Sequence, residues 1–195
     1  GEEVALPETN RADGLDNFPP FLLTLGKKND IFYMLRMIIY KIFSKENMGG
    51  FFMKKVAVVY WSGSGNTEEM AKSVLEGAKK GGADAELKRF EDFKVDDLAG
   101  YDGFLFGCPA TGSEELQEDY VEPFFVEAES KLSGVPVGLF GSYGWGGGAF
   151  MESWAERVRT AGAKLVSDGL VVENAPDDDG LKACEELGEA LAKSL

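Results

Sequence analysis

A short run of glycine, hydroxyl and amide residues separates an apolar run from a helical pattern. The run reads Ser62-Gly63-Ser64-Gly65-Asn66-Thr67. Its glycines permit close approach and backbone conformations that a Cβ would forbid, and the free N–H groups at the start of the following helix attract an anion. The hydroxyl and amide side chains add neutral donors. The run therefore predicts a site for a phosphate monoester that needs no Lys or Arg.

Residue spacing argues against two other kinds of phosphate loop. A Walker loop needs a Lys where this chain has Asn66, and a dinucleotide fingerprint needs a third Gly where it has Glu68. The structural alternative is an ordinary Gly-rich turn in which a Thr or Asn side chain caps the helix.

A second loop combines two aromatic residues with a flexible backbone. It reads Gly141-Ser142-Tyr143-Gly144-Trp145-Gly146-Gly147-Gly148. Ordering so many glycines costs conformational entropy, so the loop is not typical of a core element. An exposed Trp145 would stack on a planar ring; the alternative is an indole that folds back over a helix end as packing.

A third loop places a flexible glycine beside a carboxylate. It reads Pro109-Ala110-Thr111-Gly112-Ser113-Glu114-Glu115, and its alternative reading is a surface turn followed by a solvated acidic helix start. Asn174 is a weaker candidate, because a lone Asn often only holds a turn.

Charge and composition narrow the classes of function. The 195 residues carry a net charge of −14, with no His and two Cys, Cys108 and Cys184. Without His, His-based triads and His metal sites are excluded. The acidic field disfavours nucleic acid and anionic membranes and favours transient encounter with basic patches of partner proteins. Two thiols without metal-ligand spacing fit a reduced, cytoplasmic protein. Separately, we expect the protein to be a monomer.

The elements that must position these loops alternate between strands and helices. Apolar and β-branched runs predict strands over 56–60, 85–90, 104–106, 135–140 and 165–172, the last interrupted at 167–169. Helical periodicity predicts helices over 68–80, 120–132, 149–160 and 179–193. Such alternation predicts an α/β fold, a three-layer α/β/α sandwich around a five-stranded parallel sheet with the order 2-1-3-4-5. Ligands of such sheets bind at the carboxyl ends of the strands, where all three loops begin.

The first and second loops, each with its preceding strand, resemble the flavodoxins of clostridial-type anaerobic bacteria. The motifs that carry the resemblance run from Val58 to Thr67 and from Phe140 to Gly146, and the similarity covers residues 53–195. The resemblance implies a short-chain, flavodoxin-like fold that binds FMN without a covalent bond. It also implies a low-potential one-electron carrier between redox enzymes, and not an enzyme with a substrate of its own.

Carried over by position, the resemblance implies that Ser62–Thr67 hold the FMN phosphate and that Trp145 stacks on one face of the flavin ring. Gly144 and the backbone near it would line the ring edge. The Gly112 carbonyl would accept a hydrogen bond from the protonated flavin N5, and the Glu114 carboxylate would accept one from flavin N3. The full set of cofactor-binding candidates is Ser62, Gly63, Ser64, Gly65, Asn66, Thr67, Pro109, Ala110, Thr111, Gly112, Ser113, Glu114, Ser142, Tyr143, Gly144, Trp145, Gly146 and Asn174.

Three residues depart from the family pattern. Thr111 stands where several relatives have Met or another apolar residue, Ser113 where Asp is common, and Gly147 where Asp is frequent. These are the positions at which we expect the redox potential to depart from that of the relatives.

Two functions of other classes share this fold. An FMN-dependent NAD(P)H:quinone-type reductase would need a second pocket for its substrate, for which the sequence gives no signal. A receiver-type signalling domain would need an Asp at the end of the third strand, where this chain has Gly107-Cys108-Pro109.

Residues 1–52 differ in character from the rest. Their apolar run over 31–43 is shorter than the about 20 residues that a membrane-spanning helix needs. The codons of Gly49 and Gly50, just ahead of Met53, can spell a purine-rich ribosome-binding sequence. We therefore expect Met53 to be the native start and residues 1–52 to be translated upstream sequence outside the native fold.

Overall fold

A parallel sheet forms the middle layer of residues 53–195, the part of the chain that the computed structural model describes. The predictions for residues 1–52 lie outside these residues. The strands are β1 (Lys55–Tyr60), β2 (Asp84–Arg89), β3 (Gly103–Gly107), β4 (Pro136–Tyr143), β5 (Lys164–Leu165) and β6 (Leu170–Glu173). They follow the order β2-β1-β3-β4-β5, with β6 also paired to β4. Since β5 and β6 are the two pieces of the interrupted fifth strand, the predicted order 2-1-3-4-5 is confirmed.

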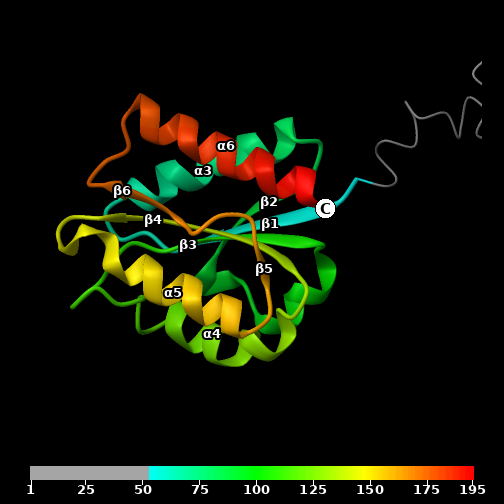
Figure 1. Cartoon of the computed structure of the whole chain (residues 1–195), viewed down its shortest axis with the longest axis horizontal. Coiled ribbons are helices and arrows are strands. Elements are labelled where there is room, and N and C mark those ends of the chain that lie inside the picture. The colour runs from blue at the N-terminus through cyan, green and yellow to red at the C-terminus, as the bar shows by residue number, and fades with distance from the viewer. Residues whose placement is uncertain (1–52) are drawn as a thin grey trace, which may run out of the picture. The chain divides into compact units, whose positions relative to one another are not determined.

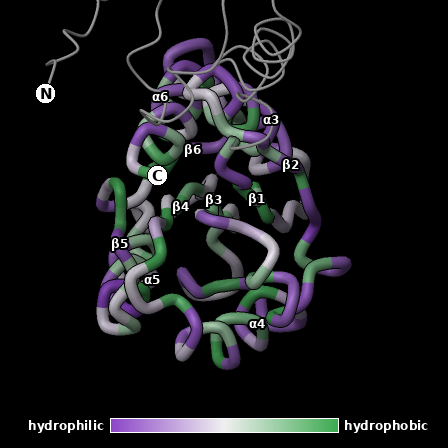
Figure 2. The backbone as a smooth tube through the Cα atoms, turned by 90° about the vertical axis from the view of Figure 1, so that its right-hand side faces the viewer, coloured by the Kyte–Doolittle hydropathy of each residue, from purple (hydrophilic) through white to green (hydrophobic). Residues whose placement is uncertain are grey.

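Helices cover both faces of this sheet. In Figure 1, α3 (Asn66–Lys80) and α6 (Asp178–Ser194) lie on one face, and α4 (Val121–Ala128) and α5 (Ala149–Thr160) lie on the other. Figure 2 shows the same layers after a quarter turn. Short 3₁₀ helices occupy Phe90–Asp92, Val95–Gly100, Glu129–Lys131 and Gly146–Gly148. The three-layer α/β/α sandwich is therefore confirmed.

Side chains of each central strand alternate between two cores. On β1, Val56 and Val58 pack into the core under α3 and α6, whereas Ala57 and Val59 pack into the core under α4 and α5. All four are fully buried. A strand covered on both faces needs apolar residues at every position, and this explains the unbroken apolar run.

The core beneath α4 and α5 is aromatic. Phe104 and Phe106 stack with ring centroids 5.4 Å apart, and Phe125 meets Trp154 edge to face at 5.3 Å. These rings bury large apolar areas next to the strand that leads into the third loop, so the sheet is a firm support for that loop.

The helix pair on the other face packs unusually closely, through two glycines. A Cβ built on Gly77 of α3 would lie 1.9 Å from the Glu185 carbonyl oxygen, and one built on Gly188 of α6 would lie 2.1 Å from that of Val74. Backbone meets backbone at both positions, so any larger residue would push α3 and α6 apart.

Most predicted boundaries lie within two residues of those in the structure, as for α3, which begins at Asn66 and not at residue 68, but two are further off. The helix expected over 120–132 ends at Ala128 and continues as a 3₁₀ turn over Glu129–Lys131, because the chain must tighten before it enters β4. The strand expected over 135–140 runs on to Tyr143, so Ser142 lies in a strand and not in the glycine-rich loop. Its extension pairs with β6, from Phe140↔Leu170 to Tyr143↔Glu173.

Candidate functional site

The three candidate loops meet at one edge of the sheet, joined by backbone hydrogen bonds. The Trp61 N–H donates to the Gly107 carbonyl at 2.9 Å. The Ala110 N–H donates to Ser142 at 2.9 Å, and the Asn174 N–H to Tyr143 at 2.7 Å. Each bond ties the end of one strand to its neighbour. The edge predicted from the strand order is therefore where the structure brings the candidate residues together.

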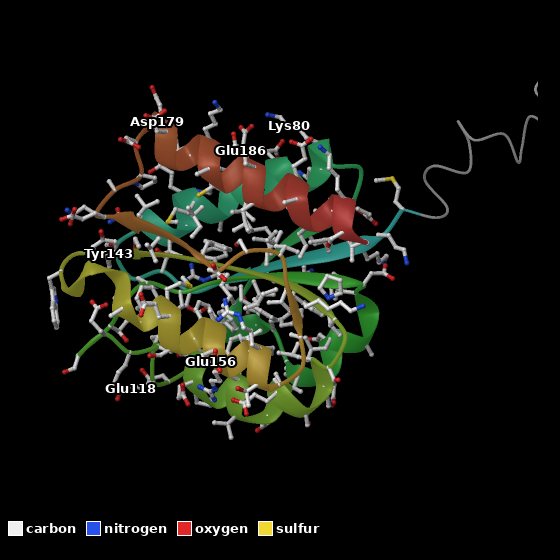
Figure 3. All side chains as sticks on the ribbon, viewed as in Figure 1. Lys80, Glu118, Tyr143, Glu156, Asp179 and Glu186 are labelled. Atoms are coloured by element: carbon white, nitrogen blue, oxygen red, sulfur yellow. The ribbon has the colours of Figure 1, made fainter. Side chains whose placement is uncertain are left out.

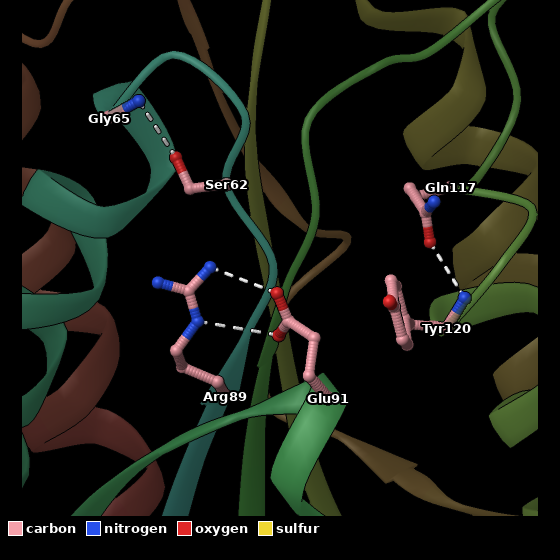
Figure 4. Close-up of polar contacts among 6 residues, drawn as sticks. All are labelled: Ser62, Gly65, Arg89, Glu91, Gln117 and Tyr120. Carbon is pink, nitrogen blue, oxygen red and sulfur yellow. Dashed lines mark hydrogen bonds and ion pairs between the residues drawn. The ribbon is translucent and has the colours of Figure 1, made fainter.

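The first loop ends in a helix start that no side chain caps. Helix α3 begins at Asn66, and its cap residue, Gly65, has a left-handed φ of 98°. The Gly65 N–H donates to the Ser62 hydroxyl at 3.1 Å (Figure 4), and the first N–H bonded back to the cap is that of Glu69. The preceding N–H groups of the first turn have no partner within the helix. The alternative of a Thr- or Asn-capped turn is wrong, and the arrangement suits an anion.

The nearest cation on α3 is already paired. Lys72 Nζ lies 2.7 Å from a Glu68 carboxylate oxygen. This hydrogen bond lowers the pKa of Glu68 and raises that of Lys72. An anion at the start of α3 would therefore be held by N–H and hydroxyl donors.

Two buried hydroxyls connect α3 to β4. Thr67 is 1% exposed and Ser142 is 3% exposed, and their hydroxyl oxygens lie 3.0 Å apart. The contact places the last residues of β4 directly against the start of α3.

The loop after β4 exposes its tryptophan. Trp145 is 64% exposed, so the alternative in which the indole packs over a helix end is wrong. The next three residues, Gly146–Gly148, all have positive φ, between 72° and 81°. Only glycine takes this conformation at little cost, so the backbone itself turns the loop and leaves the indole free to stack on a ring.

The loop after β3 closes into a tight turn. Thr111 and Glu115 exchange two backbone hydrogen bonds of 3.0 Å, and the Thr111 hydroxyl also donates to the Glu115 carbonyl. Inside the turn, Gly112 has a φ of 52° and Glu114 a φ of 62°. A positive φ is uncommon for a residue with a side chain, and here it accompanies a Glu114 carboxylate that reaches the first turn of α5.

That carboxylate links two of the loops. Its Oε2 accepts a hydrogen bond of 3.3 Å from the N–H of Phe150, in the first turn of α5. A Cβ on Gly146 would lie 2.4 Å from the same carboxyl group. The sequence reasoning missed Phe150, because a backbone donor 36 residues away leaves no local signal.

Two residues close in sequence to this turn, Gln117 and Cys108, are buried. The Gln117 Oε1 accepts a hydrogen bond from the Tyr120 N–H at 2.7 Å (Figure 4). It also accepts one from the Asp119 N–H at 3.1 Å, and the two bonds hold the chain ahead of α4. Burial raises the pKa of the Cys108 thiol to about 12. This thiol is therefore neutral near pH 7 and takes no part as a nucleophile.

A cavity of about 560 Å³ lies beside the loop after β3. Four glutamates line it: Glu114, Glu115, Glu118 and Glu122. Its one cation, Arg157, forms ion pairs with Glu122 and Glu129. A nicotinamide dinucleotide, which carries phosphates, would find an acidic wall here, so the cavity does not fit the second pocket that a reductase needs.

The charge of residues 53–195 is predominantly negative. From residue 53 onward the chain has 27 Asp and Glu against 14 Lys and Arg, a difference of 13. Figure 3 shows Glu118 and Asp179 toward the same end of the molecule as Tyr143.

Within residues 53–195 no group of three acidic or sulfur side chains is close enough to hold a metal ion. No helix in that part of the chain is long and apolar enough to cross a membrane.

These features fit a phosphate monoester attached to a planar ring. Uncapped N–H groups and hydroxyls follow β1, and an exposed indole lies in the loop after β4, with β3 between the two strands. Gly144 leaves open backbone between them, since a Cβ there would meet only the Asn174 Oδ1, at 3.7 Å. FMN combines these two chemical groups.

Comparison with known proteins gives the same answer. The profile of a family described as flavodoxin matches residues 58–188. The flavodoxin of Megasphaera elsdenii is 51% identical over 142 residues, 71% of this chain and 99% of that protein. The flavodoxin of Clostridium beijerinckii is 42% identical over 135 residues, 69% of this chain and 97% of that protein. The solution structure of two-electron reduced Megasphaera elsdenii flavodoxin superposes with a TM-score of 0.65, covering 71% of this chain and 98% of that one.

Proposed function

The chain belongs to the flavodoxin family and is an FMN-binding electron carrier, and we propose that its three sheet-edge loops hold FMN for one-electron transfer at low potential. It is an electron-transfer protein and not an enzyme, and the reductase alternative is not favoured. One observation carries the proposal: the uncapped start of α3 and the exposed Trp145 lie at the same edge, joined through the Thr67–Ser142 contact.

The phosphate is assigned to residues Ser62–Thr67. The left-handed Gly65 and the free N–H groups of the first turn of α3 support this assignment, because they form an anion site from backbone alone. The hydroxyls of Ser62, Ser64 and Thr67 supplement it with neutral donors.

The flavin ring is assigned to the two other loops. Trp145, whose indole is 64% exposed, would cover one face of the ring and exclude water from it. Residues 109–114 and 142–146, with Asn174, line its remaining edges. Gly112 has no neighbour within 4 Å of a Cβ, which leaves its peptide room to offer the carbonyl oxygen to flavin N5. The Glu114 carboxylate, whose Oε2 accepts from the Phe150 N–H, would also be the acceptor for flavin N3.

Bound FMN supplies the redox chemistry, and the protein tunes it. The carboxylates of Glu114 and Glu115 and the net charge of −13 for residues 53–195 oppose added negative charge. The neighbouring cations Lys72 and Arg157 are paired with glutamates and do not offset this field. These residues would therefore hold the addition of a second electron to bound FMN at low potential.

The three departures from the family pattern are expected to shift that potential. The Thr111 hydroxyl is bonded to the Glu115 carbonyl, so this side chain is held within the turn and offers no large apolar cover to the ring. Ser113 and Gly147 are exposed and uncharged where relatives often carry Asp.

The redox partners are proposed to be proteins with basic surfaces that bind transiently. Charge complementarity would steer their encounter with the acidic edge. A monomer is supported by the small number of exposed large apolar side chains within residues 53–195, which are Met53, Tyr120, Val126 and Trp145. A cytoplasmic location is supported by the two free, buried thiols.

Residues 53–195 are proposed to suffice for FMN binding, with residues 1–52 outside the native fold. A chain that begins at Met53 is expected to bind FMN with unchanged affinity. Weaker binding by the shortened chain would contradict this boundary.

A redox titration of the FMN-loaded protein tests the proposed function. We expect two separated one-electron steps, with the second at the lower potential, and negligible oxidation of NADPH. A single two-electron step with rapid NADPH oxidation would instead establish the reductase.

A further inference from the structure

Two buried hydroxyls form a polar link between the phosphate loop and the strand that leads to Trp145. Only three polar or charged residues are buried in residues 53–195: Thr67, Gln117 and Ser142. Two of them contact each other, with Thr67 Oγ1 and Ser142 Oγ 3.0 Å apart. A buried polar pair costs free energy unless its hydrogen bonds are made, so its donors and acceptors can be counted.

One of the two hydroxyl protons of Thr67 and Ser142 remains without an acceptor in the described part of the chain. Each hydroxyl brings one proton and two lone pairs, and the shared hydrogen bond uses one of the two protons. Neither hydroxyl makes another hydrogen bond within residues 53–195. One of the two hydroxyls is thus free to donate to a further acceptor.

The surroundings of the two hydroxyls indicate which of them keeps a proton to donate. Thr67 is the second residue of α3, beside the uncapped N–H groups where an anion is favoured. Ser142 lies inside the sheet, where its carbonyl accepts from Ala110 and its strand pairs with Val172 of β6. A negatively charged acceptor is therefore expected next to Thr67 and not next to Ser142.

We propose that Ser142 is a positioning residue for phosphate recognition: its hydroxyl donates to Thr67 Oγ1 and leaves the Thr67 proton to the phosphate of FMN. This inference rests on the proposed function, in which Ser62–Thr67 bind that phosphate. It reassigns Ser142 from a direct cofactor contact to a residue that acts through Thr67. It also ties the phosphate end to β4, whose next residues carry Trp145.

Affinities for FMN and riboflavin separate this role from a structural one, because riboflavin has the ring but no phosphate. We expect Ser142→Ala to weaken FMN binding roughly 10-fold, the size of one hydrogen bond to a charged group, and to leave riboflavin binding within about twofold. Thr67→Val should do the same. In the double variant, the loss should equal that of Thr67→Val alone, because Ser142 then has no hydroxyl to orient. Ser73→Ala, elsewhere on α3, is the matched control and should change neither affinity.

The outcomes distinguish the inference from the function on which it rests. If the unaltered protein binds riboflavin as tightly as FMN, the phosphate loop itself is wrong. If that protein prefers FMN, the inference is overturned when Ser142→Ala weakens both ligands equally or weakens neither. Additive losses in the double variant would also overturn it.

Thermal unfolding of the apoproteins checks that each variant folds. Ser142→Thr provides a second test should Ser142→Ala not fold, because it keeps the hydroxyl on a residue that suits a strand. This variant should keep the preference for FMN over riboflavin. Loss of that preference in folded Ser142→Thr would contradict the inference.

Discussion

The two ends of the site are built in opposite ways. At the phosphate end, residues 62–67 run into a 15-residue helix, and a buried hydroxyl pair anchors them to β4. At the ring end, residues 144–148 contain three consecutive left-handed glycines and a tryptophan that is 64% exposed. Both ends use glycine and lead into a helix, α3 at the phosphate end and α5 at the ring end, but only the phosphate end has a buried hydroxyl contact to a neighbouring strand.

This contrast assigns different tasks to the two ends. Donors at the phosphate end are held in place before any ligand arrives, so little ordering opposes binding there. The glycines of the ring end permit adjustment, and the Glu114 carboxylate, bonded to the Phe150 N–H, limits it. We infer that the phosphate end distinguishes FMN from riboflavin, whereas the ring end binds the flavin ring and tunes its redox state.

The largest effect is expected at the exposed indole. Trp145→Ala should weaken FMN and riboflavin equally, by roughly 10- to 100-fold, because stacking on one aromatic side chain contributes about 1–3 kcal/mol. Fluorescence titration with each ligand measures it. Trp145→Phe keeps an aromatic face and should lose less. Unchanged affinity in Trp145→Ala would remove the stacking assignment.

The phosphate end can be tested with a matched pair of glycines. Gly65 and Gly82 have φ of 98° and 94°, and neither has an atom within 4 Å of a Cβ. Alanine at either position should cost about 1–2 kcal/mol of folding stability through the same left-handed strain. Only Gly65→Ala should also weaken FMN binding, roughly 10-fold, with riboflavin unchanged. An equal loss of FMN affinity in Gly82→Ala would show that the effect is not local.

The link between the two ring loops should give a smaller effect. Glu114→Ala removes the acceptor for the Phe150 N–H and a negative charge at the start of α5, and should lower the free energy of unfolding by about 1 kcal/mol. Affinity for both ligands should fall by roughly threefold. Urea unfolding and ligand titration measure these changes. Glu115→Ala, an exposed neighbour, is the control, and identical behaviour of the two variants would contradict the link.

Salt concentration should have the smallest effect on FMN affinity. The direction of that effect shows whether the phosphate site contains a cation. Because the phosphate loop contains no cation and residues 53–195 carry a net charge of −13, salt should screen repulsion of the FMN dianion. Affinity for FMN should rise roughly twofold between low and physiological salt, and affinity for riboflavin should stay constant. A steep fall in FMN affinity would reveal a cation-based phosphate site.

Most of the fold could be predicted from sequence because its signals are local. The apolar run at 56–60 and the helical periodicity at 149–160 each specify their element, and Ser167-Asp168-Gly169 marks the break between β5 and β6. The loop positions follow from the strand order.

The contacts within the site could not be predicted in the same way. The extension of β4 to Tyr143 depends on its pairing with β6, and the Glu114–Phe150 hydrogen bond joins segments 36 residues apart. The contact between Thr67 and Ser142 spans 75 residues. Each depends on tertiary placement, which neither periodicity nor residue type records.

The division of the site into two ends is tested most directly by amide NMR titration of the apoprotein with two fragments of FMN. Inorganic phosphate should shift the amides of residues 62–67 and leave the Trp145 indole unchanged. Riboflavin should shift that indole and the amides of residues 111–114 and leave residues 62–67 unchanged. If both fragments shift the same amides, or phosphate leaves residues 62–67 unmoved, the assignment of phosphate and ring to separate ends is wrong.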